Sequence, residues 1–224
     1  MYHQPNRKEG LPSRVSRQTM NYSRLKICVI ALILLAGAAM QVRAQETDEE
    51  YKVYDAVVRG MFRDGVTQFD MNAKVSKIVI RDHTVSEYAS SLESENWEQV
   101  KNGIRELTDE TIAGYEAARK DESNLKPKLD IPLEYALISD SDLRKFFPTE
   151  QGRTIEQWNE FYKLYPSSAG YNSFSKVGFD KQRKNALVYF INWCGPLCGT
   201  GTYVLVEKGE NGWTVKNAAM MWIS

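Results

Sequence analysis

The C-terminal segment constrains the fold most, because residues 172–224 carry the pattern of consecutive strands separated by turns. Residues 186–193 are β-branched, aromatic and almost continuously apolar, which is typical of a strand covered on both faces. Asn211-Gly212 is a strong hairpin signal, since both residues readily adopt positive φ. The segment therefore predicts four strands, over residues 173–179, 186–193, 202–207 and 213–223.

Helical segments are predicted upstream of these strands, each from a capping residue followed by apolar positions. Thr47 and Glu50 have capping-box spacing and introduce a helix that ends at Asp64-Gly65. Residues 97–120 predict one interrupted helix or two, with Thr108 able to cap the second. The caps of two further helices are Ser139 and Thr154.

Two short strands are expected among these helices, over residues 75–80 and 135–138. Helices that precede a set of adjacent strands indicate the α+β class. We expect N-terminal helices with a C-terminal antiparallel sheet, a four-strand meander. Residues 45–224 lack internal repeats and Pro/Gly-rich linkers, so they predict a single domain.

The N-terminal segment has the pattern of a secretory signal. Residues 27–40 form an uncharged apolar run of 14 residues, fewer than the about 20 that a membrane-spanning helix needs. Val42-Arg43-Ala44 places small residues at the positions that a signal peptidase recognises. We expect cleavage after Ala44, with an uncleaved anchor over residues 27–40 as the alternative. Met20 is an alternative start to Met1, because it would shorten an unusually long basic region.

The charge of the exported part argues against a nucleic-acid partner. Residues 1–44 hold seven basic side chains and one acidic side chain, out of 29 of each in the whole chain. The remainder has 22 basic and 28 acidic side chains and a net charge of −6. A surface that binds many phosphates needs the opposite excess.

Several stretches resemble a family of uncharacterised exported bacterial proteins. They are residues 161–170 (Phe-Tyr-Lys-Leu-Tyr-Pro-Ser-Ser-Ala-Gly), 175–179, 186–189, 194–205 (starting Cys-Gly-Pro-Leu-Cys-Gly) and the ending Trp222-Ile-Ser224. The resemblance covers mainly the chain from Phe161 onward, with a weaker one over residues 54–84. It implies export and a shared fold, and it implies no catalytic residues.

Cys194 and Cys198 are the sharpest feature of the exported part. Three residues separate them, whereas the thioredoxin-type motif has two, and the following residues predict a strand where the redox motif needs a helix N-terminus. Nearby cysteines of exported proteins are normally oxidised. A structural disulfide is therefore expected, with reduced thiols and redox or metal chemistry as the alternatives.

Catalytic and metal sites lack a sequence signature. His83 is the one histidine after Ala44, so any catalytic triad or zinc site would depend on it. Asp140 to Asp142 has the pattern of a helix cap and lacks further calcium ligands at EF-hand spacing. We identify no catalytic, cofactor-binding or metal-ligating residues and expect no cofactor.

Aromatic residues could form a ligand site on the sheet or simply fill the core. Tryptophans at helix and strand positions are more often core residues. The alternative is a concave aromatic site for a glycan or an apolar ligand, and its candidate ligand-facing residues are Trp158, Tyr162 and Tyr203.

These patterns favour a non-enzymatic, exported binding domain. We expect it in the periplasm or outside the cell, with an envelope ligand or protein as its partner and membrane contact only through residues 27–40 if they are uncleaved. The alternatives are a carboxylate-dependent hydrolase and a thiol-disulfide protein that uses Cys194 and Cys198. Acidic residues converging in a deep cleft would favour the hydrolase, and a shallow aromatic groove would favour the binding domain.

Overall fold

The computed structural model describes residues 48–62, 74–86, 97–149 and 153–224. The chain divides into two compact units, residues 1–45 and 46–224, and all described residues belong to the second. The expected signal, its cleavage after Ala44 and the alternative start at Met20 lie outside the described residues. Within the described ranges, no helix is both long and apolar enough to cross a membrane.

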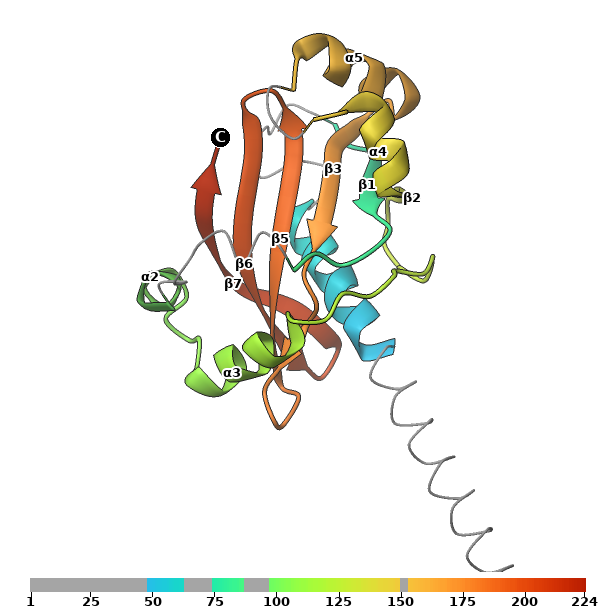
Figure 1. Ribbon diagram of the computed structural model, residues 1–224. Coiled ribbons are helices and arrows are strands. Elements are labelled where there is room, and N and C mark those ends of the chain that lie inside the picture. Colours follow the sequence, from blue (N-terminus) through green and yellow to red (C-terminus); the bar gives the residue numbers. More distant parts are fainter. Residues whose placement is uncertain (1–47, 63–73, 87–96, 150–152) are drawn as a thin grey trace, which may run out of the picture. The chain divides into compact units, whose positions relative to one another are not determined.

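A seven-stranded mixed sheet is the centre of the second unit (Figure 1). Its strand order is β2-β1-β3-β5-β6-β7, and β4 pairs with β5 off this path. Strands β1 and β2 run parallel to each other, β1 also runs parallel to β3, and the remaining pairs are antiparallel. The bounds are β1 Lys77–Arg81, β2 Glu134–Ile138, β3 Ser168–Phe174, β4 Gly178–Phe179, β5 Asn185–Gly195, β6 Cys198–Gly209 and β7 Gly212–Ile223.

The sheet confirms the α+β class and corrects the predicted four-strand meander. The C-terminal strands are antiparallel neighbours as expected, but β1 and β2 extend the sheet beyond β3 through parallel pairing. Parallel neighbours need long crossover connections, here the helical segments that follow β1 and β2. Sequence reasoning found both strands but did not place them in the sheet, because parallel pairing leaves no local turn signal.

Strand boundaries also differ from their predictions: β3 starts at Ser168 rather than at residue 173, and β6 covers Cys198–Gly209 rather than 202–207. The predicted strand over residues 173–179 is divided, since β3 ends at Phe174 and β4 starts at Gly178. Ser175 interrupts the strand: its Oγ accepts a hydrogen bond from the backbone N–H of Tyr189 at 2.9 Å. The regular pairing of β3 with β5 thus ends at Phe174, because the Ser175 side chain, and not a backbone carbonyl, accepts the hydrogen bond from Tyr189.

Three helices, α3 to α5, begin after the expected capping residues. The first helix covers residues 48–61, and Thr47 of its predicted capping box lies outside the described residues. Thr108 and Ser139 accept hydrogen bonds from backbone N–H groups three residues later, and Thr154 forms the expected capping box with Gln157. The remaining helices are α2 Trp97–Gly103, α3 Asp109–Ala118, α4 Asp140–Phe146 and α5 Ile155–Leu164.

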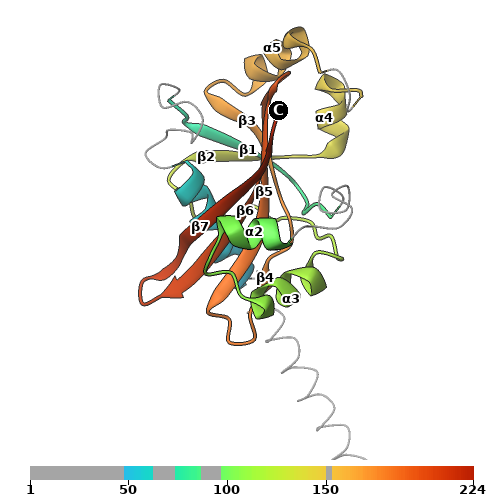
Figure 2. The same cartoon turned by 90° about the vertical axis from the view of Figure 1, so that its left-hand side faces the viewer.

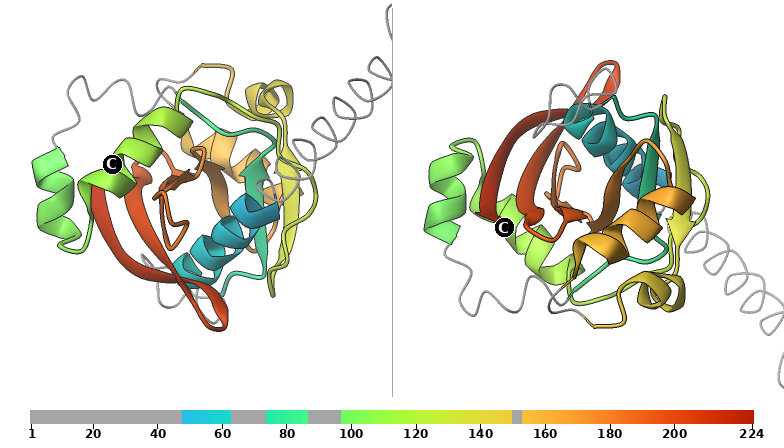
Figure 3. Two further views of the ribbon diagram at one scale, coloured as in Figure 1. Left: turned by 90° about the horizontal axis from the view of Figure 1, so that it is seen from below. Right: turned by 90° about the horizontal axis from the view of Figure 1, so that it is seen from above.

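The sheet separates two layers of core. Alternate residues of β5 face opposite sides, so Val188 and Phe190 pack with the first helix, whereas Leu187 and Tyr189 pack with residues of α2 and α3. Figures 2 and 3 show α2 and α3 on one side of the curved sheet and the first helix along the other. A third cluster lies under α4 and α5 at one end of the sheet, and this cluster positions the site described next.

Candidate functional site

A small pocket opens at the end of the sheet, where β1, β3, α4 and the segment before α5 meet. We call it the arginine pocket; its cavity has a volume of about 140 Å³. Its lining combines three arginines and one carboxylate with apolar side chains. The lining residues are Arg81, Asp140, Leu143, Arg144, Phe147, Pro148, Arg153 and Tyr171.

Parallel strand pairing brings the polar lining residues together. Arg81 is the last residue of β1 and is in register with Ile138, the last residue of β2. Ser139 then caps α4, so Asp140 starts this helix beside the carboxyl end of β1. Ligands of parallel sheets characteristically bind at the carboxyl ends of the strands, which is the position of this pocket.

An ion-pair network fixes one wall of the pocket. Arg81 donates to Oδ1 of Asp140 through Nη2 at 2.6 Å and through Nε at 3.0 Å. His83 lies behind this pair, with Nδ1 2.7 Å from Oδ1 of Asp82 and Nε2 3.3 Å from Nη2 of Arg81. Nε2 of His83 also lies 3.5 Å from Oδ2 of Asp140, so the imidazole contacts both members of the ion pair. The network neutralises the charge of Arg81 within the protein.

Arg153 has a different environment, because aromatic rings surround its guanidinium group. Its Cζ lies 4.8 Å from the ring centroid of Trp193, 5.3 Å from that of Phe147 and 5.4 Å from that of Tyr171. Nε and Nη1 are buried and have no hydrogen-bond partner within the described part of the chain. Cation–π attraction holds the group in place but does not neutralise its charge.

Arg144 adds a second guanidinium group without an acidic partner. It lies in the last turn of α4, is exposed, and forms no ion pair with any residue in the described ranges. With Arg81 paired to Asp140, the pocket has two cationic groups in excess. Such a cavity attracts anions and disfavours cations.

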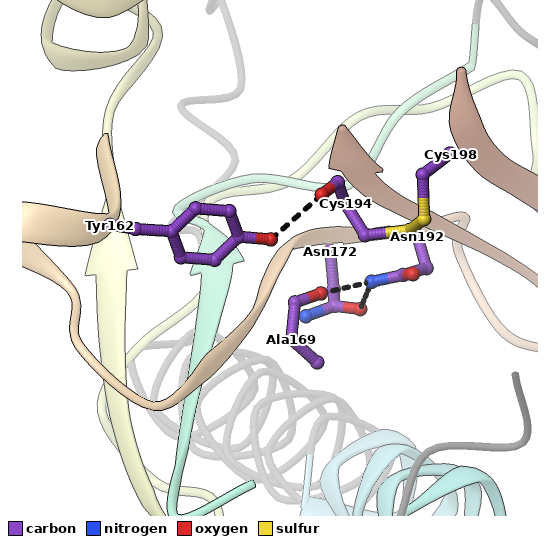
Figure 4. The surroundings of a disulfide bond; sticks show 6 residues. All are labelled: Tyr162, Ala169, Asn172, Asn192, Cys194 and Cys198. Atoms are coloured by element: carbon purple, nitrogen blue, oxygen red, sulfur yellow. Dashed lines mark hydrogen bonds between the residues drawn. A yellow bond between two sulfur atoms is a disulfide. The ribbon is translucent and has the colours of Figure 1, made fainter. Parts of the chain in front are cut away.

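The disulfide forms as the sequence predicts (Figure 4), and the residue before it, Trp193, contacts Arg153 of the pocket. Cys194 and Cys198 are bonded at the connection between β5 and β6, with their Cα atoms 5.0 Å apart. Both lie at strand ends, so neither receives the helix N-terminal dipole that a redox-active thiol requires. This arrangement favours the structural interpretation over the thiol-disulfide alternative.

Polar contacts hold β3 and β5 together below the disulfide. The side-chain Nδ2 of Asn192 donates to the carbonyl of Ala169 at 2.7 Å and to Oδ1 of Asn172 at 2.9 Å (Figure 4). Nδ2 of Asn172 in turn donates to the carbonyl of Val79 at 3.0 Å. These buried amides therefore connect β1, β3 and β5.

Trp193 links the disulfide hairpin to the arginine pocket. It directly precedes Cys194, and its ring covers Arg153 and lies 5.0 Å from the ring of Trp222. Gly170 permits this close approach of β3: its φ is +76°, and a Cβ there would lie 1.8 Å from the carbonyl oxygen of Trp193. The hairpin thus shapes the aromatic surround of Arg153.

The three candidate ligand-facing aromatics occupy two separate places. Trp158 is 2% exposed and stacks on Tyr171 with ring centroids 6.0 Å apart, so it supports the pocket wall from behind. Tyr162 is half-buried and packs 5.7 Å from Trp158. Tyr203 is fully buried across the sheet, 5.5 Å from Tyr115. Trp158 and Tyr203 are therefore core residues in this structure, and the three rings do not share one surface.

The chemistry expected of a hydrolase is not assembled in the pocket. Asp140 is the one carboxylate among the described lining residues, and Arg81 donates hydrogen bonds to one of its oxygens. Among the described residues, no cluster of three or more His, Cys, Asp or Glu side chains could hold a metal ion. The arrangement suits binding of an anion through guanidinium groups.

Sequence reasoning did not identify the arginine pocket. Its charged residues come from three segments. Arg81 ends β1, whereas Arg153 lies between α4 and α5, beyond β2. No spacing rule connects such residues. The nearest sequence signal was the predicted helix start at Ser139, which placed Asp140 beside a strand end.

No protein-family model matches the chain, and no match is found among curated proteins or solved structures. The resemblance to exported bacterial proteins over residues 161–224 therefore stays a prediction.

Proposed function

We propose that this protein is an exported binding domain that takes up a small anionic ligand in the arginine pocket. The observation that carries the proposal is Arg153, a guanidinium group enclosed by three aromatic rings and without an acidic partner among the described residues. This observation supports the binding role expected from the sequence, with the arginine pocket as the proposed location and an anion as the proposed ligand.

The energetics of a partly buried cation support an anionic ligand. Removing a charge from water is costly unless a counter-charge or hydrogen bonds replace the lost solvation. The aromatic rings offset part of this cost for Arg153, and a bound carboxylate or phosphate oxygen would offset more. Since the rings already fix the guanidinium plane, little side-chain entropy is lost when the ligand binds.

Export is part of the proposal and is supported by the disulfide. The Cys194–Cys198 bond is compatible with an oxidising compartment, where such bonds persist. The signal pattern over residues 1–44 supplies the route. Mass analysis of the native protein should find Gln45 as its first residue, and a membrane-bound product that retains residues 27–40 would show an anchor instead.

Anion binding is tested by thermal unfolding of the purified protein with and without sodium butyrate or sodium phosphate, at constant ionic strength. We expect at least one anion to raise the melting temperature of the wild type and not that of Arg153→Gln. Arg105→Gln is the matched control, because Arg105 is exposed and does not line the pocket. An equal shift in all three proteins would mean nonspecific salt stabilisation and would refute the proposal.

A further inference from the structure

We infer that the ligand of the arginine pocket is a short aliphatic dicarboxylate, an inference that rests on the proposed anion-binding function. The pocket contains two guanidinium groups without acidic partners in the described part of the chain, and its lining also includes apolar side chains. These features together specify the charge, the size and the chemical character of the ligand.

The charge follows from the pairing within the lining. Among the described lining residues, three arginines and one aspartate give a net charge of +2, and the 2.6 Å contact between Arg81 and Asp140 assigns the aspartate to Arg81. A monoanion would leave one excess positive charge in a partly enclosed cavity. A dianion neutralises both Arg144 and Arg153, and charge-assisted bonds to guanidinium groups are among the strongest that proteins form.

The size follows from the cavity. Its volume of about 140 Å³ is well below the roughly 300–1,000 Å³ of pockets for drug-sized ligands. A four- or five-carbon acid fits within this volume, whereas a nucleotide or an oligosaccharide would extend beyond it.

The chemical character follows from the apolar part of the lining. Leu143 and Phe147 come from one side of α4 and its end, and Pro148 and Tyr171 extend the apolar surface. A hydrocarbon chain between two carboxylates can contact this wall, because apolar contacts need no hydrogen bonds. Inorganic phosphate carries the charge but has no apolar body to place there.

The two arginines have complementary roles in this arrangement. Arg153 is held by Phe147, Tyr171 and Trp193 and supplies a fixed anchor for one carboxylate. Arg144 is exposed and free of ion pairs among the described residues, so it can follow the second carboxylate. Arg144 should therefore determine the preference for two charges, while Arg153 should determine binding itself.

Isothermal titration calorimetry with succinate, butyrate and inorganic phosphate tests the inference at pH 7.5 and constant ionic strength. Succinate and butyrate share a four-carbon chain and differ by one carboxylate. We expect succinate to bind the wild type at least about tenfold more tightly than butyrate, the effect of one additional charge-assisted contact. Arg144→Gln should reduce this ratio to less than about threefold, and Arg105→Gln should leave it unchanged.

The possible failures are distinguishable. If butyrate binds as tightly as succinate and Arg153→Gln abolishes both, anion binding stands and the dicarboxylate inference is wrong. Tighter binding of phosphate than of succinate would likewise overturn the inference in favour of a compact anion. If none of the three anions binds the wild type, both the proposed anion-binding function and the dicarboxylate inference are wrong. Because Arg144 is exposed, loss of folding does not confound its variant.

Discussion

The hydroxyl of Tyr162 donates a hydrogen bond to the backbone carbonyl of Cys194 at 2.8 Å. This contact ties α5 to the disulfide hairpin, across 32 residues of sequence. Burial raises the pKa of Tyr162 to about 12, so the hydroxyl stays a donor throughout the physiological range. The carbonyl of Cys194 is thus held by a contact that does not depend on the sulfur atoms.

Replacement of both cysteines by serine should therefore weaken the protein without displacing the hairpin. The closed loop is short, so loss of the disulfide should cost about 2 kcal/mol of unfolding free energy on the chain-entropy model. Urea unfolding of Cys194→Ser/Cys198→Ser measures the loss, and the fold should persist by circular dichroism. Adding Tyr162→Phe to this variant should cost a further ~1 kcal/mol.

Thiol titration of the native protein gives an independent check of the disulfide. No free thiol should react at Cys194 or Cys198 before unfolding and reduction. Two rapidly reacting thiols in the folded protein would contradict the structural role and favour thiol-disulfide exchange.

The carboxyl of Asp55 should make stability depend on pH. Burial raises its pKa from the usual 3.8 to about 6, although Oδ1 accepts a 3.0 Å hydrogen bond from the backbone N–H of Asp130. The folded state therefore favours the protonated carboxyl. Its stabilisation is fully present below pH 3.8 and is lost as pH rises through about 6.

Asp55→Asn isolates this effect, because the amide oxygen accepts the same hydrogen bond without ionising. We expect the variant to equal the wild type near pH 3.8 and to be more stable at pH 7. The gain should be roughly 1 kcal/mol, a value reduced for the partial exposure of the carboxyl. Melting temperatures across this range test the prediction, and a variant less stable at pH 7 would contradict it.

Local signals explain how much of this fold could be predicted. Thr108, Ser139 and Thr154 were found as caps because each cap bonds a residue three positions later. Asn211-Gly212 likewise marked the hairpin between β6 and β7 from adjacent residues alone. Elements whose determinants lie within one turn were therefore predictable.

Features that depend on distant contacts were not predictable from one sequence. The parallel pairing of β1 with β2 and β3 follows from crossovers that bury both faces of Val79 and its neighbours. The arginine pocket requires that same pairing before Arg81 can meet Asp140. Because no local pattern in the sequence predicts that β1 pairs with β2, nothing in the sequence indicates that Arg81 and Asp140 lie close together.

The final prediction concerns Trp222, which connects the C-terminal strand to the arginine pocket. Its Nε1 donates to the hydroxyl of Tyr189 at 2.7 Å, and its ring packs 5.0 Å from Trp193, which covers Arg153. Because Trp222 is only partly buried, Trp222→Ala should cost about 2 kcal/mol, below the usual loss for a fully buried tryptophan. The melting temperature should fall by about 4–8 °C in a domain of this size.

The variant should also weaken anion binding, since Trp193 loses a neighbour that supports its ring. Ile223→Ala is the matched control: Ile223 follows Trp222 in the same strand, is 69% exposed and should change stability by less than about 0.5 kcal/mol. A Trp222→Ala protein that is destabilised but retains wild-type anion affinity would show that Trp193 keeps its position over Arg153 without Trp222. If both variants had the melting temperature of the wild type, the end of β7 would contribute nothing to the stability of the core.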